Sequence, residues 1–211
     1  MDGFMNIDQS FLVRSLPELE AMYDAPLERS LRKQMDRLDE HSRALIAASP
    51  LLILATMGER ADNSPRGDHP GFVQVADDRT LLIPDRRGNN RLDSLRNIVA
   101  DPRVGLLFLI PGVTETFRVN GEAAISRDPA LLERFNVAGK LPRTVIVVKV
   151  LEAYMQCPRA LVRSDLWNPR RFAAPGAVPT MGTILAAHTN GFVDAAQLDE
   201  ENKTRIPATL Y

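Results

Sequence analysis

The sequence contains little cysteine and no long apolar run. A single cysteine, Cys157, among 211 residues excludes an intramolecular disulfide framework and any zinc or iron–sulfur site built from several cysteines. The most apolar stretches, 44–55 and 104–110, are broken by Pro50 and closed by Pro111, so both fall short of the about 18 residues of a membrane span. The N-terminus lacks the basic and apolar segments of a signal peptide. These absences predict a reduced, cytoplasmic protein with no membrane partner.

An excess of charge of one sign is also missing. The 26 Lys and Arg and 27 Asp and Glu give a formal net charge of -1, which argues against a nucleic-acid partner but allows a local basic patch that holds a phosphate. No G-x-G pair occurs, and neither a Rossmann fingerprint nor a P-loop is present. The three histidines are far apart, so we predict no metal site. His69 is interpreted as a solvated loop residue, with a place beside a site as the alternative.

The hydrophobic periodicity divides the chain into three parts. Helical spacing in the first 45 residues predicts helices at 11–23 and 27–45. Beyond them the pattern predicts short strands at 51–57, 71–77, 80–84, 104–112, 114–126 and 144–156, and helices at 89–102, 128–137 and 181–189. The polar stretch 61–70 is interpreted as a loop, and the closely spaced first three strands as an antiparallel meander.

The expected fold class is therefore mainly β with helices (α+β), as a barrel or a sandwich. We expect one domain, with a helical arm at about 1–45, a barrel at about 46–156 and a C-terminal arm at about 157–211. The apolar stripes of the two arms exceed what a monomer of this size covers easily, which favours a homodimer.

Arginines gather where the strand at 80–84 leads into the next helix. Arg86 and Arg87 lie in the loop, and Asn89, Asn90 and Arg91 open the predicted helix. Free N–H groups and the positive end of the helix dipole make such a start an anion site, and arginines there are unfavourable unless an anion offsets them. The alternative is a solvated loop whose asparagine caps the helix.

Two further elements are candidates for a site. Arg66 stands beside Asp68 at the mouth of a strand, which is a site for an anion or merely a surface ion pair. In the strand at 114–121, Thr116, Arg118 and Asn120 share one face. That polar face is either the lining of a pocket or an ordinary solvent face.

The order of these motifs resembles one protein family. The segments TLLIPD at 80–85, NNRL at 89–92, DPRVGLLF at 101–108 and ETFRVNG at 115–121 are similar to those of the pyridoxamine 5′-phosphate oxidase-related flavoproteins. The resemblance covers roughly residues 45–155 and implies the split β-barrel that binds flavin mononucleotide (FMN). It also implies a homodimer with FMN in clefts between the two barrels.

The resemblance assigns roles to named residues. It implies that Arg66 and Arg91 hold the FMN phosphate with help from Asn90 and Arg86, and that Asp68 belongs to the same site. Ile83 and Pro84 would lie along the flavin ring, and Thr116 stands where the oxidase has a glutamine that contacts the flavin. The second subunit would contribute residues of the tail. The candidates there are Gln156, Arg163, Ser164 and Trp167, with Arg163 and Trp167 on the substrate side, although Trp167 equally fits a core or dimer anchor.

The C-terminus, KTRIPATLY, lacks the Arg-x-His signature with which the oxidase binds its substrate, so synthesis of pyridoxal phosphate is not carried over. The expected function is an FMN-dependent oxidoreductase, because the flavin itself performs the electron transfer and no acid–base pair is visible. Its partner would be an unknown small molecule or a reduced nicotinamide. The alternatives are a non-catalytic flavin store, or a split barrel that uses deazaflavin or heme.

Overall fold

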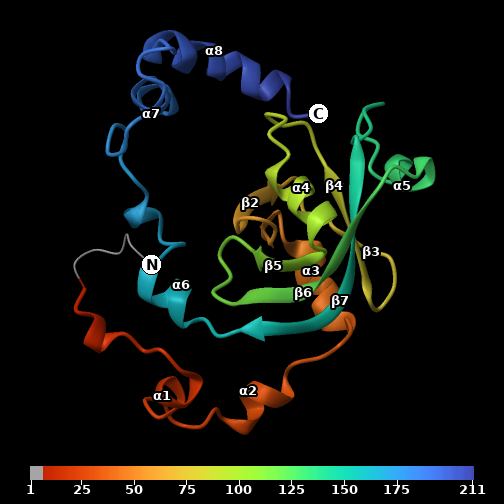
Figure 1. Cartoon of the computed structure of the whole chain (residues 1–211). Helices are drawn as coiled ribbons and strands as arrows, with labels where there is room; N and C mark the ends of the chain where they lie inside the picture. Colours follow the sequence, from red (N-terminus) through yellow and green to blue (C-terminus); the bar gives the residue numbers. More distant parts are fainter. Residues whose placement is uncertain (1–6) are drawn as a thin grey trace. The chain divides into compact units, whose positions relative to one another are not determined.

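The computed structural model describes residues 7–211 and contains two compact units, Met1–Gln34 and Met35–Tyr211 (Figure 1). In the first unit the described elements are η1 (Gln9–Phe11), α1 (Leu16–Glu20) and α2 (Glu28–Arg32). The helix predicted at 11–23 is much shorter than expected. It starts only after Ser15, whose hydroxyl accepts from the Glu18 N–H, and Pro17 occupies its first turn.

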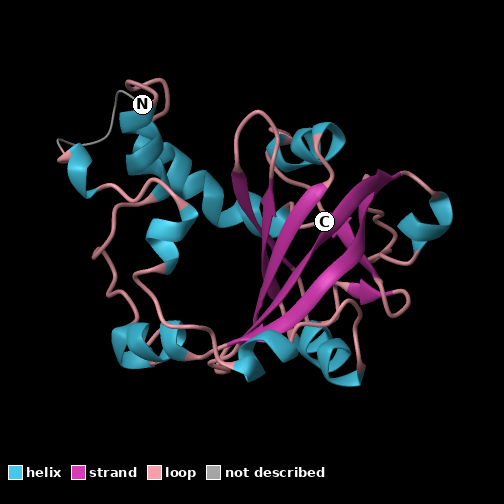
Figure 2. Cartoon of the chain, turned by 60° about the horizontal axis from the view of Figure 1, so that its bottom comes forward, coloured by secondary structure: helices cyan, strands magenta, loops and turns pink. Residues whose placement is uncertain are grey.

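The second unit is built on one seven-stranded antiparallel sheet with the order β2-β1-β5-β6-β7-β4-β3. Figure 2 shows these strands grouped together. The strands are β1 (Leu51–Thr56), β2 (Asp62–Gly67), β3 (Gln74–Val75), β4 (Thr80–Asp85), β5 (Arg103–Leu109), β6 (Thr116–Ser126) and β7 (Thr144–Gln156). The helical elements are α3 (Glu40–Ala48), α4 (Asp93–Ala100), α5 (Pro129–Glu133), α6 (Arg159–Ser164), η2 (Pro169–Arg171), α7 (Met181–His188) and α8 (Ala195–Ala208). The predicted α+β class is confirmed.

The core lies on the inner face of this sheet. Alternate residues of β1, β5 and β6 are buried, among them Leu52, Leu54 and Phe108. Strand β4 has apolar residues on both faces, and each face packs against a cluster of buried side chains. Ile83 belongs to the main core, whereas Leu82 packs with Phe135 next to α5. The continuous apolar run TLLIP is explained by this double burial.

Several predicted elements are wrong in detail. The stretch interpreted as a loop contains β2, whose residues alternate between half-buried and exposed and whose hydrogen bonds go to β1. The strand predicted at 71–77 is only the two-residue β3. The three strands predicted first do not form the expected meander, because β1 pairs with β2 and β5 while β3 pairs with β4.

The helix predicted at 27–45 is also wrong, because the chain forms two helices, α2 and α3, in its place. Between them Met35 forms a β-bridge with Ala153. Asp39 begins the second helix by accepting from the Ser42 N–H at 2.8 Å. A polar residue with this capping ability favours a new helix start over a continuous helix.

The C-terminal segment returns to the sheet through two helices that pack on each other. The N–H of Gly182 in α7 donates to Asp199 of α8 at 2.8 Å, and a Cβ at Gly182 would lie 2.2 Å from the Ala195 carbonyl oxygen. After α8 the chain ends beside the loop between β4 and α4 (Figure 1). Within residues 7–211 no helix combines the length and the apolar character that crossing a bilayer requires.

Candidate functional site

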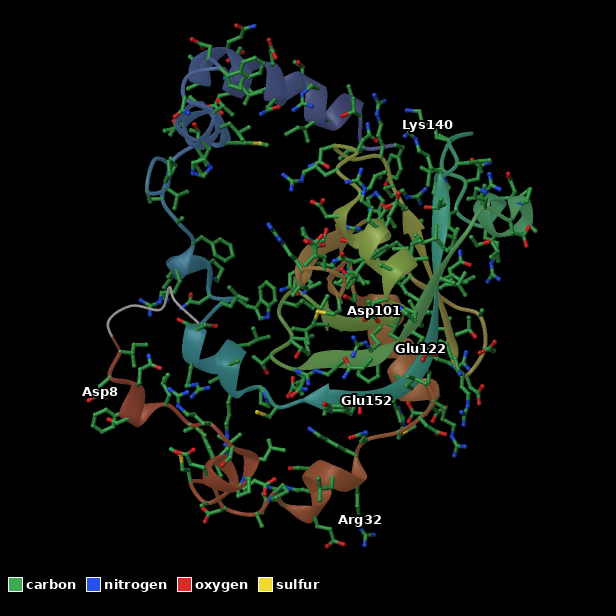
Figure 3. All side chains as sticks on the ribbon, viewed as in Figure 1. Asp8, Arg32, Asp101, Glu122, Lys140 and Glu152 are labelled. Carbon is green, nitrogen blue, oxygen red and sulfur yellow. The ribbon has the colours of Figure 1, made fainter. Side chains whose placement is uncertain are left out.

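A cavity of about 900 Å³ opens between the ends of β2 and β4, the first turn of α4 and the segment 140–143. Basic side chains outnumber acidic ones in its lining, and Lys140 lies in the loop that precedes β7 (Figure 3). The basic residues are Arg66, Arg86, Arg87, Arg91, Lys140 and Arg143, and the acidic ones are Asp62, Asp85 and Asp93. This imbalance favours an anionic ligand.

Arg66, on β2, has an unsatisfied nitrogen. Its Nη1 donates to the Ser64 hydroxyl at 2.5 Å and to the Pro65 carbonyl at 3.1 Å. Its Nε is buried and has no hydrogen-bond partner among the described residues. A buried donor left without an acceptor costs about 1–3 kcal/mol. Arg66 therefore lines the cavity with one of its donors unpaired.

The loop before α4 has a strained backbone. Asn90 and Leu92 both adopt left-handed conformations, with φ of 62° and 63°. Non-glycine residues pay a steric penalty there, and such residues cluster at ligand sites. Leu92 is the N-cap of α4, and no described side chain caps the helix, contrary to the alternative in which an asparagine does. The free N–H groups of the first turn therefore remain available at the cavity.

The basic residues differ in how far they are already paired. Arg91 Nε donates to Asp93 Oδ2 at 2.8 Å, but three quarters of its side chain is exposed. Arg143 Nη1 donates to Asn90 Oδ1 at 3.4 Å. Among the described residues the lining cations without an ion pair are Arg66, Arg87, Lys140 and Arg143.

Asp85, at the end of β4, is half-buried and opposes this positive charge. Burial raises the pKa of its carboxyl group, while Arg66 and Arg143 act in the opposite direction. Its strand partner Thr144 has a buried hydroxyl with no hydrogen bond to the described residues. The cavity therefore contains one carboxyl group whose proton is held more tightly than in water.

Arg86 is part of a buried cluster. Its Nε lies 2.9 Å from Asp68 Oδ2, and its Nη1 donates to the Phe135 carbonyl at 2.7 Å. The Tyr211 hydroxyl donates to Asp68 Oδ1 at 2.5 Å, and the Arg86 guanidinium lies 5.2 Å from the centre of the Tyr211 ring. Tyr211 lines the cavity, and the sequence contains no pattern that would have indicated it.

These contacts set the ionisation of the cluster. Burial acts to raise the pKa of Asp68. Hydrogen bonds from Tyr211, from the His69 N–H and from Arg86 outweigh burial, so the pKa stays below its ordinary value. The bond to Asp68 raises the pKa of Tyr211. Asp68 is therefore ionised and Tyr211 neutral near neutral pH.

The cavity brings together part of the predicted site. Arg66, Pro84, Arg86, Asn90 and Arg91 line it, and Asp68 joins it through Arg86. Ile83 does not line it, because its side chain is fully buried in the main core.

The other predicted residues lie outside the cavity lining. Thr116 pairs with Gln156 where β6 begins and β7 ends, and the Gln156 amide oxygen, turned toward Arg118, accepts from its Nε at 3.1 Å. In the tail, Arg163 Nε donates to the Arg159 carbonyl and the Ser164 hydroxyl to the Leu161 carbonyl. Trp167 Nε1 donates to the Val113 carbonyl at 2.8 Å.

The seven-stranded antiparallel sheet with its flanking helices has the split-barrel fold. The Pyridoxamine 5'-phosphate oxidase family model matches residues 38–157, more than half of the chain. The chain belongs to this family, which confirms the resemblance seen in the sequence.

Several solved structures are similar. A putative pyridoxamine 5'-phosphate oxidase from Lactobacillus delbrueckii is 20% identical, with 57% of this chain and 95% of that chain covered and a TM-score of 0.45. An FMN-binding protein from Syntrophomonas wolfei is 18% identical, with 66% and 91% covered and a TM-score of 0.44. The FAD binding protein from Mycobacterium smegmatis is 18% identical, with 58% and 97% covered and a TM-score of 0.41. Comparison with curated protein sequences found no match.

Proposed function

We propose that the protein binds a flavin nucleotide, FMN in the first place, with the phosphate in the basic cavity, and that it acts as an oxidoreductase. The observation that carries this proposal is Arg66, which lines the cavity and has a buried Nε without an acceptor. Membership of the pyridoxamine 5′-phosphate oxidase family supports it.

The residues of the cavity fit a phosphate monoester. Arg66 offers a donor that needs an acceptor, and the uncapped start of α4 offers backbone N–H groups and a favourable dipole. Arg91 keeps its exposed terminal nitrogens for a bidentate contact. The Arg86 guanidinium already binds Asp68 and the Phe135 carbonyl, so we propose that Arg86 stabilises the site and does not bind the phosphate. The volume of about 900 Å³ lies within the usual range of ligand sites, about 300–1,000 Å³.

A bound flavin would supply hydride and electron transfer. The residues of this chain would bind and orient it, and the substrate would be a small molecule or a reduced nicotinamide. We further propose that the protein is a homodimer. In that arrangement Thr116, Gln156, Arg163 and Ser164, which lie outside the cavity of their own subunit, would serve the site of the other one.

The test compares FMN with riboflavin, which lacks the phosphate. We expect wild-type protein to bind FMN much more tightly than riboflavin. Arg66→Ala should lower the affinity for FMN about ten- to a hundredfold and leave the affinity for riboflavin unchanged, because a charge-assisted hydrogen bond contributes about 1.5–3 kcal/mol. Arg96→Ala, an exposed arginine of α4 that does not line the cavity, is the matched control. Equal affinities of wild-type protein for the two flavins would contradict the phosphate assignment.

A further inference from the structure

Tyr211 reaches the cavity from a distant part of the sequence. It follows α8 by three residues, and its hydroxyl contacts Asp68, 143 positions earlier. Both Tyr211 and Ala208 line the cavity. The C-terminal segment therefore forms part of the wall of the candidate site.

The contact completes a buried ion pair. The side chains of Asp68 and Arg86 are only 8% and 17% exposed. A buried pair is stable only when its remaining lone pairs and protons are also satisfied. Asp68 Oδ2 accepts from Arg86, and Oδ1 accepts from the His69 N–H at 2.8 Å and from the Tyr211 hydroxyl. Removing the hydroxyl would leave a buried carboxylate oxygen with one partner fewer.

The ion pair joins the loop that follows β2, the strand of Arg66, to the loop that contains Asn90 and Arg91. Asp68 follows Arg66 by two residues, at the end of β2. Arg86 follows the last residue of β4 and begins the loop that contains Asn90 and Arg91. The pair and the Tyr211 ring over Arg86 thus fix the spacing between these two loops.

We propose that Tyr211 is a positioning residue that holds these two loops in their binding arrangement before a ligand arrives. Its hydroxyl acts through Asp68, and its ring acts on Arg86. The ordering of the two loops is a property of the ligand-free protein. Only the expected effect on flavin binding rests on the proposed function. Ordering before binding lowers the cost of association and slows release.

Hydrogen–deuterium exchange of the ligand-free protein tests the proposal directly. We expect Tyr211→Phe, which removes only the hydroxyl, to speed amide exchange in segments 66–72 and 86–92 by about tenfold, since a hydrogen bond to a charged group is lost. Tyr23→Phe, an exposed tyrosine of the Met1–Gln34 unit, is the matched control. Exchange in β5 and β6 should not change, which separates a local effect from general destabilisation. Unchanged exchange in both segments would overturn the proposal.

The rate of FMN release, followed by flavin fluorescence after dilution, is the second readout. We expect Tyr211→Phe to release FMN about tenfold faster than wild type and Tyr23→Phe to behave as wild type. Faster exchange with an unchanged release rate would overturn the positioning role. If wild-type protein binds no flavin, the proposed function fails, while the exchange experiment still decides whether Tyr211 orders the loops.

Discussion

The arginines of the cavity fall into two groups that differ in their partners. Arg86 contacts Asp68, the Phe135 carbonyl and the Tyr211 ring, so these contacts stabilise the wall of the cavity. Arg66 has a buried donor without an acceptor. The sequence alone does not distinguish these two arginines, but their surroundings differ. On that basis we propose a structural role for Arg86 and a ligand-binding role for Arg66.

Arg91 provides a test of the phosphate site. We expect Arg91→Ala to lower the affinity for FMN by about ten- to a hundredfold, with little effect on the affinity for riboflavin, because a charge-assisted hydrogen bond is lost. Arg91→Lys should recover only part of the affinity, since an ammonium group lacks the planar fork. Titration of flavin fluorescence measures both, with Arg96→Ala as the control. Wild-type affinity in both variants would make Arg91 a surface residue.

The carboxyl group of Asp85 predicts a pH-dependent stability. Its pKa is raised by burial, so the protonated form is favoured in the folded state. That contribution to stability is present below the unfolded pKa and is lost as the pH rises through the folded pKa. We expect Asp85→Asn to raise the free energy of unfolding relative to wild type at about pH 7, and the difference to vanish in acid.

Urea denaturation at several pH values measures this difference. Asp78→Asn, which changes an exposed loop residue, is the control. A difference between Asp85→Asn and wild type that is the same at all pH values would contradict the assignment.

The single residues of the site were only partly predictable. Arg66, Arg86, Asn90 and Arg91, which the helix start and the family resemblance had singled out, line the cavity. Tyr211 was not, because its partner Asp68 lies 143 positions away and no local pattern connects them. Such contacts depend on tertiary packing alone.

At the level of elements, burial decided which predictions were right. In strands β1, β4, β5, β6 and β7, buried residues either alternate with less buried ones or lie on both faces. Their apolar pattern in the sequence therefore predicted them. Strand β2 is polar on both faces and is held by backbone hydrogen bonds to β1. Hydrophobic periodicity cannot detect a strand of this kind.

The pairing of β6 with β7 depends on one glycine. At Gly121 the register shifts, and a Cβ there would lie 2.0 Å from the Lys149 carbonyl oxygen. We expect Gly121→Ala to destabilise the fold by about 2–4 kcal/mol and to lower Tm by roughly 5–15 °C, because backbone must move. Gly88→Ala, where a Cβ meets open space, is the control for thermal unfolding. Equal Tm values for both variants would show that the sheet relaxes without cost.

At the scale of the whole molecule, the distribution of exposed residues favours self-association. In the Met1–Gln34 unit, large apolar side chains are exposed on and beside the two short α-helices, including Leu16, Met22, Leu27 and Leu31. Apolar side chains in such numbers on short helices are typical of segments that pack against a partner. The proposed homodimer accounts for them and for the position of Arg163 outside the cavity of its own subunit.

Subunit complementation tests whether the site is shared between two copies. We expect Arg163→Ala to keep its flavin but to be reduced more slowly by a reduced nicotinamide, in anaerobic stopped-flow bleaching of the flavin band. Mixing it with Arg66→Ala should restore fast reduction. In a mixed dimer one cavity combines the intact Arg66 of one subunit with the intact Arg163 of the other. Free exchange of equal amounts gives roughly a quarter of the wild-type sites.

The FMN concentration should saturate wild type but not Arg66→Ala, so that the second variant alone contributes little. Co-purification of one variant, untagged, with an affinity-tagged copy of the other establishes that subunits have exchanged. Arg170→Ala, an exposed arginine of the same tail, is the control for Arg163. A mixture that reacts as the mean of its two components would show that Arg163 does not act across the dimer. A stable monomer with full flavin occupancy would rule out the shared site altogether, because the residues outside the cavity would then have no second cavity to serve.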